Sequence, residues 1–149
     1  MSSATVMLSG GQHSTTCLYW ALKEFNHADA IGFDYGQKHL IELEVAKEIC
    51  HNLSINYTVI DLKGVFVNSS LVDSQQDVSA QHTINPDLPS SFTAGRNAVF
   101  LSVTAGLAYN KKINNIVTGV CQTDYSGYPD CRRVFIDSIE RSMSLALDS

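Results

Sequence analysis

Short apolar runs and helix-spaced apolar residues alternate along the first part of the chain. The predicted elements are, in order, a strand over 4–8, a helix with Leu18, Ala21, Leu22 and Phe25 on one face, a strand over 28–35, a helix over 38–53 and a strand over 56–62. This β-α-β-α-β order predicts a parallel sheet with right-handed crossovers. Such sheets bind ligands beyond the carboxyl ends of their strands.

The rest of the chain begins with a polar stretch and then returns to the same alternation. Residues 63–94 are rich in Ser, Asn, Asp, Gln and Pro. We expect a mobile loop over the site there, with a disordered surface insertion as the alternative. The first element predicted after it is an apolar helix that residues 94–97 open and that continues through Val99, Phe100, Val103, Leu107 and Ala108. A strand over 115–120 follows, and then a helix from about Arg133 with Ile136, Ile139, Met143 and Ala146 on one face. The pattern predicts one α/β domain over 1–149, a Rossmann-like three-layer α/β/α fold with a parallel sheet.

Composition and charge narrow the classes of protein to consider. With 149 residues, of which 44% are hydrophobic, the chain can bury a core as a single domain. The formal net charge of -5 argues against a broadly basic nucleic-acid surface, and no apolar run reaches the length of a membrane span. The N-terminus has no signal-peptide pattern. We therefore expect a cytoplasmic protein with neither a nucleic-acid nor a membrane partner.

The four cysteines are Cys17, Cys50, Cys121 and Cys131, and they form no Cys-x-x-Cys pair. The sequence thus gives no support for a zinc knuckle or a dithiol redox motif. Cys17 and Cys50 lie in apolar helical patterns and are predicted to be buried thiols. Cys121 and Cys131 flank a polar loop, where a reactive role remains open.

The stretch Ser9-Gly10-Gly11-Gln12-His13-Ser14-Thr15 has the composition of an anion-binding loop. It follows a predicted strand and opens a predicted helix, so main-chain N–H groups and the helix dipole can face a bound oxyanion. Ser14 and Thr15 add hydroxyl donors. A diphosphate is the expected ligand, and a simple turn that caps an ordinary helix is the alternative. The stretch is not a Walker-type P-loop, because no Gly-Lys-Ser/Thr follows.

Three further segments are rich in polar and aromatic groups. Asp34-Tyr35-Gly36-Gln37 ends the second predicted strand, at the same edge of the sheet as the glycine loop. Gly95-Arg96-Asn97 opens a helix, and Arg96 can pair with a phosphate or a carboxylate. Residues 121–132 suit a flat polar heterocycle. There, Asp124 or Asp130 could accept from a guanine-like N–H edge, or could simply cap a turn.

Taken together, residues 6–17, 33–39, 95–97 and 118–132 resemble the 7-cyano-7-deazaguanine synthases of queuosine biosynthesis. These are members of the PP-loop ATP pyrophosphatase superfamily, with an adenine nucleotide α-hydrolase-like fold. The resemblance implies an ATP-dependent carbon–nitrogen ligase that converts 7-carboxy-7-deazaguanine and ammonia to the nitrile through adenylated intermediates. It implies ATP and Mg²⁺ as cofactors, and a homodimer where a complete chain is formed.

The resemblance also implies roles for individual residues. The residues implied for ATP binding are Leu8, Ser9, Gly10, Gly11, Gln12, His13, Ser14, Thr15, Gly95, Arg96 and Asn97. Those implied around the deazaguanine are Tyr35, Gln37, His39, Thr123, Asp124, Ser126, Gly127, Tyr128, Asp130 and Arg132. The implied catalytic residues are Asp34, Arg96 and Asp124.

Three departures from the family pattern bear on activity. His13 stands where the family carries Asp, and Ala94 stands where it carries Pro. The family's C-terminal portion, in which a cysteine cluster binds a structural Zn²⁺, is absent from this sequence. Two alternatives therefore stay open: an impaired or split nucleotide-binding remnant, and another PP-loop chemistry such as tRNA thiolation, with Cys121 or Cys131 carrying sulfur.

Overall fold

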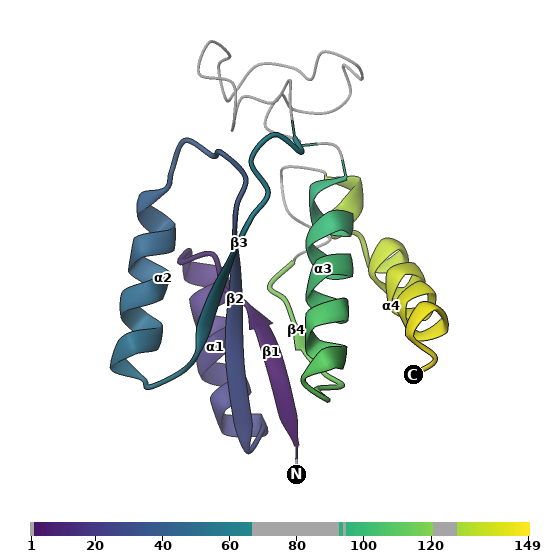
Figure 1. The fold of residues 1–149 in the computed structure, drawn as a ribbon, viewed down its shortest axis with the longest axis horizontal. Helices are drawn as coiled ribbons and strands as arrows, with labels where there is room; N and C mark the ends of the chain where they lie inside the picture. The colour runs from purple at the N-terminus through teal and green to yellow at the C-terminus, as the bar shows by residue number, and fades with distance from the viewer. Residues whose placement is uncertain (1, 67–92, 94, 121–127) are drawn as a thin grey trace.

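The fold is a four-stranded parallel sheet with helices on both faces (Figure 1). It was obtained as a computed structural model that describes residues 2–66, 93, 95–120 and 128–149. The first half contains β1 (Ser3–Met7), α1 (Gln12–Glu24), β2 (His27–Asp34), α2 (Ile41–Asn52) and β3 (Tyr57–Asp61). The second half contains α3 (Arg96–Asn110), β4 (Ile116–Val117), the 3-10 turn η1 (Pro129–Cys131) and α4 (Arg133–Leu147). The α/β class expected from the sequence is confirmed.

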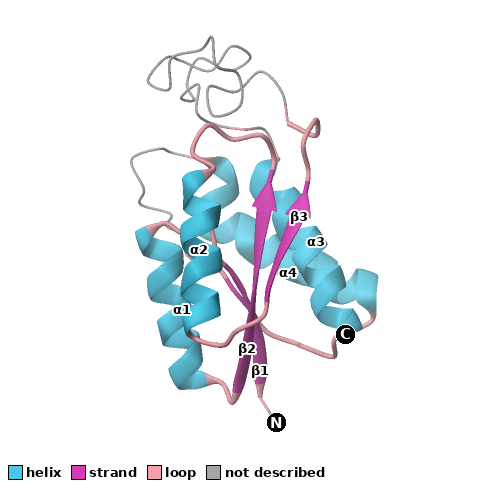
Figure 2. Cartoon of the chain, turned by 60° about the vertical axis from the view of Figure 1, so that its left-hand side comes forward, coloured by secondary structure: helices cyan, strands magenta, loops and turns pink. Residues whose placement is uncertain are grey.

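The strands run in the order β3-β2-β1-β4, and each neighbouring pair is parallel. The chain moves outward from β1 through β2 to β3, and then returns through α3 to place β4 on the other side of β1. Two outward crossovers put α1 and α2 on one face, and the return crossover puts α3 on the opposite face (Figure 2). The direction of winding therefore changes between β1 and β4, where doubly wound sheets bind ligands.

The two faces of the sheet bury different side chains. Toward α1 and α2, a fully apolar cluster joins Val6 and Leu8 of the first strand and loop to Leu18, Ala21, Ala46 and Cys50 of the helices. Toward α3, Phe33 stacks on Phe100 with ring centroids 4.2 Å apart. Cys50 is buried as predicted, but Cys17 is only half-buried, because its position on α1 lies toward the rim of the cluster.

The segment expected to form a mobile loop, 63–94, lies mostly outside the described residues. Its described ends pack into the body of the protein: Phe66 and Thr93 are both buried. Phe66 meets the rings of Tyr35 and Phe100 edge-on, at centroid distances of 5.7 and 5.9 Å. The ends of this segment are thereby fixed beside the carboxyl edge of the sheet.

Candidate functional site

A cleft of about 460 Å³ lies at the carboxyl edge of the sheet. Its walls come from the ends of β1 and β2, the start of α1 and α3, the residues after β4, and η1. This is the point where the winding of the sheet reverses, so the position of the cleft matches that of ligand sites in doubly wound folds. Segments that are more than a hundred residues apart in sequence, Ser9 and Tyr128 among them, line the same space.

The glycine loop between β1 and α1 is held in a fixed shape by its own hydroxyl groups. The Ser9 backbone N–H donates to Ser14 Oγ at 3.1 Å. The Thr15 hydroxyl donates to the Gly11 carbonyl at 2.8 Å, and Ser14 Oγ donates to the same oxygen at 3.2 Å. Gly11, which precedes α1, has no side chain that could cap the helix. The positive end of the helix dipole therefore faces the loop, as an anion site requires.

Gly10 is required by this loop for two independent reasons. Its φ of +91° lies in a region that residues with a Cβ rarely adopt. A Cβ at Gly10 would also overlap with the backbone carbonyl of Glu42 at the start of α2. The loop thus packs directly on the next helix, and only glycine allows that approach.

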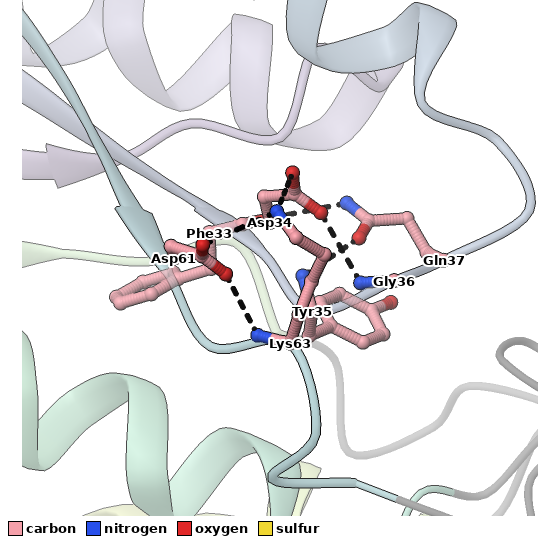
Figure 3. Close-up of polar contacts among 7 residues, drawn as sticks. All are labelled: Phe33, Asp34, Tyr35, Gly36, Gln37, Asp61 and Lys63. Atoms are coloured by element: carbon pink, nitrogen blue, oxygen red, sulfur yellow. Dashed lines mark hydrogen bonds and ion pairs between the residues drawn. The ribbon is translucent and has the colours of Figure 1, made fainter.

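A second turn, at the end of β2, is built from the side chains of Asp34 and Gln37 (Figure 3). Asp34 Oδ1 accepts from the Gly36 N–H at 3.2 Å. Gln37 accepts from the Tyr35 N–H at 2.9 Å and donates to the Phe33 carbonyl at 3.1 Å. These bonds fix the backbone on either side of Tyr35, so that Tyr35 lines the cleft.

Asp34 also forms an ion pair with Lys63, and neither residue lines the cleft. Lys63 Nζ lies 3.1 Å from Asp34 Oδ2 and 3.2 Å from Asp61 Oδ2 (Figure 3). Hydrogen bonds to Asp34 and Asp61 raise the pKa of Lys63, and hydrogen bonds from the backbone and side chain of Lys63 lower the pKa of Asp61. Asp34 does not line the cleft. Its described contacts, with Gly36 and Lys63, support a role in shaping the turn. The catalytic role expected from the sequence stays a prediction.

Arg96 supplies positive charge inside the cleft and is held there by aromatic rings. Its Nη1 donates to the Tyr35 hydroxyl at 3.1 Å. Its guanidinium carbon lies 5.7 Å from the ring centroids of both Tyr35 and Tyr128. Cation–π contacts of this kind orient an arginine without neutralising it, so its charge stays available to an anionic ligand.

The contacts of Asp130 favour the capping alternative. Its carboxylate accepts from the Asn97 N–H at 2.9 Å, and its carbonyl accepts from Asn97 Nδ2 at 2.6 Å. Both residues are buried, and together they join η1 to the start of α3. Tyr128, just before η1, thereby gains a fixed place beside Arg96.

The structure brings many of the expected site residues together. Those that line the cleft are Leu8, Ser9, His13, Ser14, Tyr35, Gln37, His39, Arg96, Asn97, Tyr128 and Asp130. Gly10, Gly11, Gln12, Thr15, Gly95 and Arg132 flank it in sequence without lining it, and Asp34 points elsewhere. Thr123, Asp124, Ser126 and Gly127 lie outside the described residues. The sequence expectations missed Phe100 and Glu42, since an apolar and an acidic position within helices carry no signal of a site.

The glycine loop does not offer a ligand set that fits a protein-held Mg²⁺. The oxygen donors described there are the hydroxyls of Ser9, Ser14 and Thr15, which bond to one another or to Gly11, and His13 replaces the expected acid. Magnesium prefers carboxylate and water oxygens. In the part of the chain that the structure describes, no group of three or more His, Cys, Asp or Glu residues could hold a metal ion. None of the described helices is long and apolar enough to cross a membrane.

The parallel sheet, its glycine loop and the cleft at the winding reversal define a doubly wound, Rossmann-like α/β protein. Two solved structures share this fold. One is a predicted subunit of a tRNA methyltransferase from Methanocaldococcus jannaschii, with a TM-score of 0.56, 20% identity, and coverage of 97% of this chain and 65% of that chain. The other is the U34-tRNA thiolase NcsA from Methanococcus maripaludis, with a TM-score of 0.52, 17% identity, and coverage of 79% and 37%. At such identities the likeness concerns the fold alone.

The comparison with sequence relatives identifies the family, which the likeness in fold does not. The family model for the queuosine biosynthesis protein QueC matches residues 3–149, and the chain belongs to this family. The 7-cyano-7-deazaguanine synthase of Clostridium botulinum (Type A) is 46% identical over 148 residues, covering 97% of this chain and 67% of the relative. That of Lysinibacillus sphaericus is 43% identical over 146 residues, covering 98% and 67%. The chain thus spans 67% of the length of these relatives.

Proposed function

We propose that this chain catalyses the ATP-dependent conversion of 7-carboxy-7-deazaguanine and ammonia to 7-cyano-7-deazaguanine, with the phosphates of ATP at the glycine loop. The observation that carries the proposal is the meeting of Ser14, Arg96 and Tyr128 in one cleft. Membership of the QueC family supplies the substrate class. The fold alone would leave several chemistries open.

The reaction uses two ATP-dependent activation steps. The substrate carboxylate attacks the α-phosphorus of ATP, and pyrophosphate leaves as the acyl-adenylate forms. Ammonia then displaces AMP to give the amide. The amide oxygen then attacks the α-phosphorus of a second ATP, and a second pyrophosphate leaves. Loss of AMP and two protons from the adenylated amide leaves the nitrile.

The chain's own groups suit the charge that develops in both activation steps. Pyrophosphate gains negative charge as it leaves, and the dipole of α1, whose positive end faces the glycine loop, favours that charge. Arg96 adds a full positive charge from α3, on the other side of the sheet. Tyr35 and Tyr128 fix its position through their rings and, for Tyr35, through its hydroxyl. Such fixed groups lower the barrier because they need no reorganisation during the reaction.

The test follows substrate, nitrile and AMP by mass spectrometry after the protein is mixed with 7-carboxy-7-deazaguanine, ammonium and ATP. We expect two molecules of AMP for each molecule of nitrile, and neither product without ATP. A protein that folds and binds ATP but leaves the carboxylic acid unchanged would show that the substrate assignment is wrong.

The ATP assignment is tested separately with Gly11→Ala. A Cβ at Gly11 would meet only the Ser9 hydroxyl, at 3.5 Å, so the fold is expected to survive while a methyl group enters the loop. We expect the Kd for ATP, measured by calorimetry, to rise about tenfold or more, which corresponds to about 1.4 kcal/mol. Gly106→Ala is the matched control, since a Cβ at that position in α3 meets nothing within 4 Å. Equal ATP affinity in Gly11→Ala and the wild type would overturn the loop assignment.

A further inference from the structure

A tyrosine two strands away from β1 reaches the glycine loop across the sheet. Tyr57, on β3, donates its hydroxyl proton to the carbonyl of Leu8 at 2.8 Å. Leu8 directly follows β1 and directly precedes Ser9, and it is almost fully buried. The two residues are 49 positions apart in sequence, and β2 lies between their strands.

Gly32 of β2 makes this contact possible. In the register of the sheet Tyr57 is opposite Ala30, so its side chain must pass over the next position on that face, which is Gly32. A Cβ at Gly32 would overlap with the hydroxyl oxygen of Tyr57 and lie 3.1 Å from the Leu8 carbonyl. The absence of a side chain at Gly32 therefore leaves the passage through which Tyr57 reaches Leu8.

The bond acts on the peptide group that opens the loop. The Leu8 carbonyl and the Ser9 N–H belong to one planar peptide unit. Tyr57 holds its oxygen, and Ser14 Oγ accepts from its N–H at 3.1 Å. The plane is thus held at both ends, and it cannot turn without breaking one of these bonds. The Ser9 side chain that follows it contacts Ser14 Oγ at 3.1 Å and the Gly11 N–H at 3.4 Å.

The hydroxyl of Tyr57 is suited to act as a permanent donor. Burial, followed by the effect of Cys50, raises the pKa of Tyr57 above its usual value, so the group keeps its proton in neutral and mildly alkaline solution. The Leu8 carbonyl points to this hydroxyl where β1 has already ended. Without the hydroxyl, a buried acceptor would have to turn toward another donor.

We propose that Tyr57 is a positioning residue for the glycine loop: it fixes the Leu8–Ser9 peptide plane, and Gly32 provides the space for it to do so. The inference rests on the proposed function only in that the loop binds the phosphates of ATP. Tyr57 itself does not line the cleft. Its effect reaches the ligand through the backbone of Ser9 and the hydroxyl of Ser14.

The test compares Tyr57→Phe with the wild type in the full chain. The ring stays and only the hydroxyl is lost, so the fold is expected to persist. We expect the Kd for ATP to rise about fivefold to tenfold, with a small change in melting temperature. Tyr109→Phe is the matched control, because Tyr109 is a half-exposed tyrosine on α3 that lines no part of the cleft. Its Kd should equal that of the wild type.

Two further measurements separate positioning from plain stabilisation and from failure of the ATP site. Amide hydrogen exchange at Ser9 and Gly11, measured without ATP, should be faster in Tyr57→Phe than in the wild type and unchanged in Tyr109→Phe. This result does not depend on whether the protein binds ATP. Gly32→Ala should displace the tyrosine ring and weaken ATP binding, and adding Tyr57→Phe to it should weaken binding little further. If the wild type binds no ATP, the proposed function fails while the exchange result still decides the positioning role.

The proposal is overturned if Tyr57→Phe leaves both the Kd and the exchange at Ser9 and Gly11 as in the wild type. It is equally overturned if the variant only melts earlier, while its folded fraction binds ATP with the wild-type Kd. That second result would assign Tyr57 to stability alone.

Discussion

The carboxylate of Asp130 caps helix α3 by accepting a hydrogen bond from the backbone N–H of Asn97 at 2.9 Å. The bond links residues 33 positions apart, and both are buried. Because the carbonyl of Asp130 also accepts from the Asn97 side chain, the start of α3 and the turn η1 form one unit. Arg96 and Tyr128, which face each other in the cleft, are carried by the two halves of this unit.

We expect Asp130→Ala to lower the free energy of unfolding by about 1–3 kcal/mol, since a buried N–H of Asn97 loses its acceptor. Urea unfolding followed by circular dichroism measures the change. Asp137→Ala is the matched control: Asp137 pairs with Arg133 on the surface of α4, and its loss should cost less than about 1 kcal/mol. Equal stability of Asp130→Ala and the wild type would remove the capping role and leave substrate binding as the role of Asp130.

The ion pairs of Lys63 predict how the turn at the end of β2 responds to pH. The pKa of Lys63 is raised above 10.5, so its contribution is complete below that pH and is lost as pH rises through the folded value. The pKa of Asp61 is lowered below 3.8, so its contribution is present above that pH and is lost as pH falls through the folded value. Both contributions therefore coexist between these limits.

We expect the melting temperature of Lys63→Gln to fall slightly below that of the wild type between about pH 4 and pH 10, a window that lies inside the ordinary pKa values of an aspartate, 3.8, and a lysine, 10.5. The difference should shrink toward both extremes, and also at high salt, because the pairs are exposed. Lys47→Gln, on the exposed face of α2, controls for the loss of one positive charge. A difference that is constant across the pH range would show that the pairs do not stabilise the turn.

Asp29 is a buried carboxylate on the α3 face of the sheet. Its Oδ2 lies 3.0 Å from Lys111 Nζ, while its Oδ1 has no hydrogen-bond partner among the described residues. Lys111→Met should lower the free energy of unfolding by about 1–3 kcal/mol, because the buried charge of Asp29 would lose its partner. Lys112→Met, at the next position, removes the same charge and should have little effect.

The single variant Asp29→Asn and the double variant Asp29→Asn/Lys111→Met complete a double-mutant cycle, in which chemical denaturation measures the free energy of unfolding of each protein. Since the carboxylate charge is then gone as well, the second substitution should recover part of the loss caused by Lys111→Met. Strict additivity of the two single effects would mean that the ion pair contributes nothing to stability.

The sequence was sufficient for the elements whose signals are local. The strand predicted over 4–8 is observed at Ser3–Met7, and the helix predicted from the spacing of Leu18 and Ala21 is observed at Gln12–Glu24. Both signals act through near neighbours in the sequence. The strand expected over 115–120 is shorter, at Ile116–Val117, and these two residues pair with Thr5 and Val6 of β1. The family resemblance, which drew on four separate segments, was confirmed by the match to QueC over residues 3–149.

Roles that depend on contacts across the sheet could not be predicted. Asp34 has the residue type of a catalytic acid or base, yet its carboxylate is engaged with Gly36 and Lys63, which only the geometry reveals. Tyr57 was part of an apolar strand pattern, and its bond to Leu8 depends on the register of three strands and on the missing side chain of Gly32. Lys63, the partner of Asp34, and Leu8, the partner of Tyr57, are both distant in sequence, so no local pattern reveals either contact.

His13 lies in the first turn of α1, where it is exposed and lines the cleft. The family carries an acid at this position according to the resemblance of the glycine loop. A carboxylate there would repel the leaving pyrophosphate unless a cation lay between them, and would help to order such a cation. We therefore expect His13→Asp to raise kcat for nitrile formation and to lower the Mg²⁺ concentration at half-maximal rate. A tenfold gain corresponds to about 1.4 kcal/mol of transition-state stabilisation.

The measurement titrates Mg²⁺ in the nitrile assay for the wild type, His13→Asp and the control His51→Asp. His51 is exposed in the last turn of α2, remote from the cleft, so its substitution should leave kcat and the Mg²⁺ dependence unchanged. The Kd for ATP and the melting temperature of His13→Asp should stay close to the wild type, because the side chain is exposed and the loop is held by Ser14 and Thr15. A rise in kcat with these two quantities constant places the effect on the reaction itself. Equal turnover at every Mg²⁺ concentration would show that the imidazole of His13 serves as well as an acid, and that the cation needs no carboxylate from this loop.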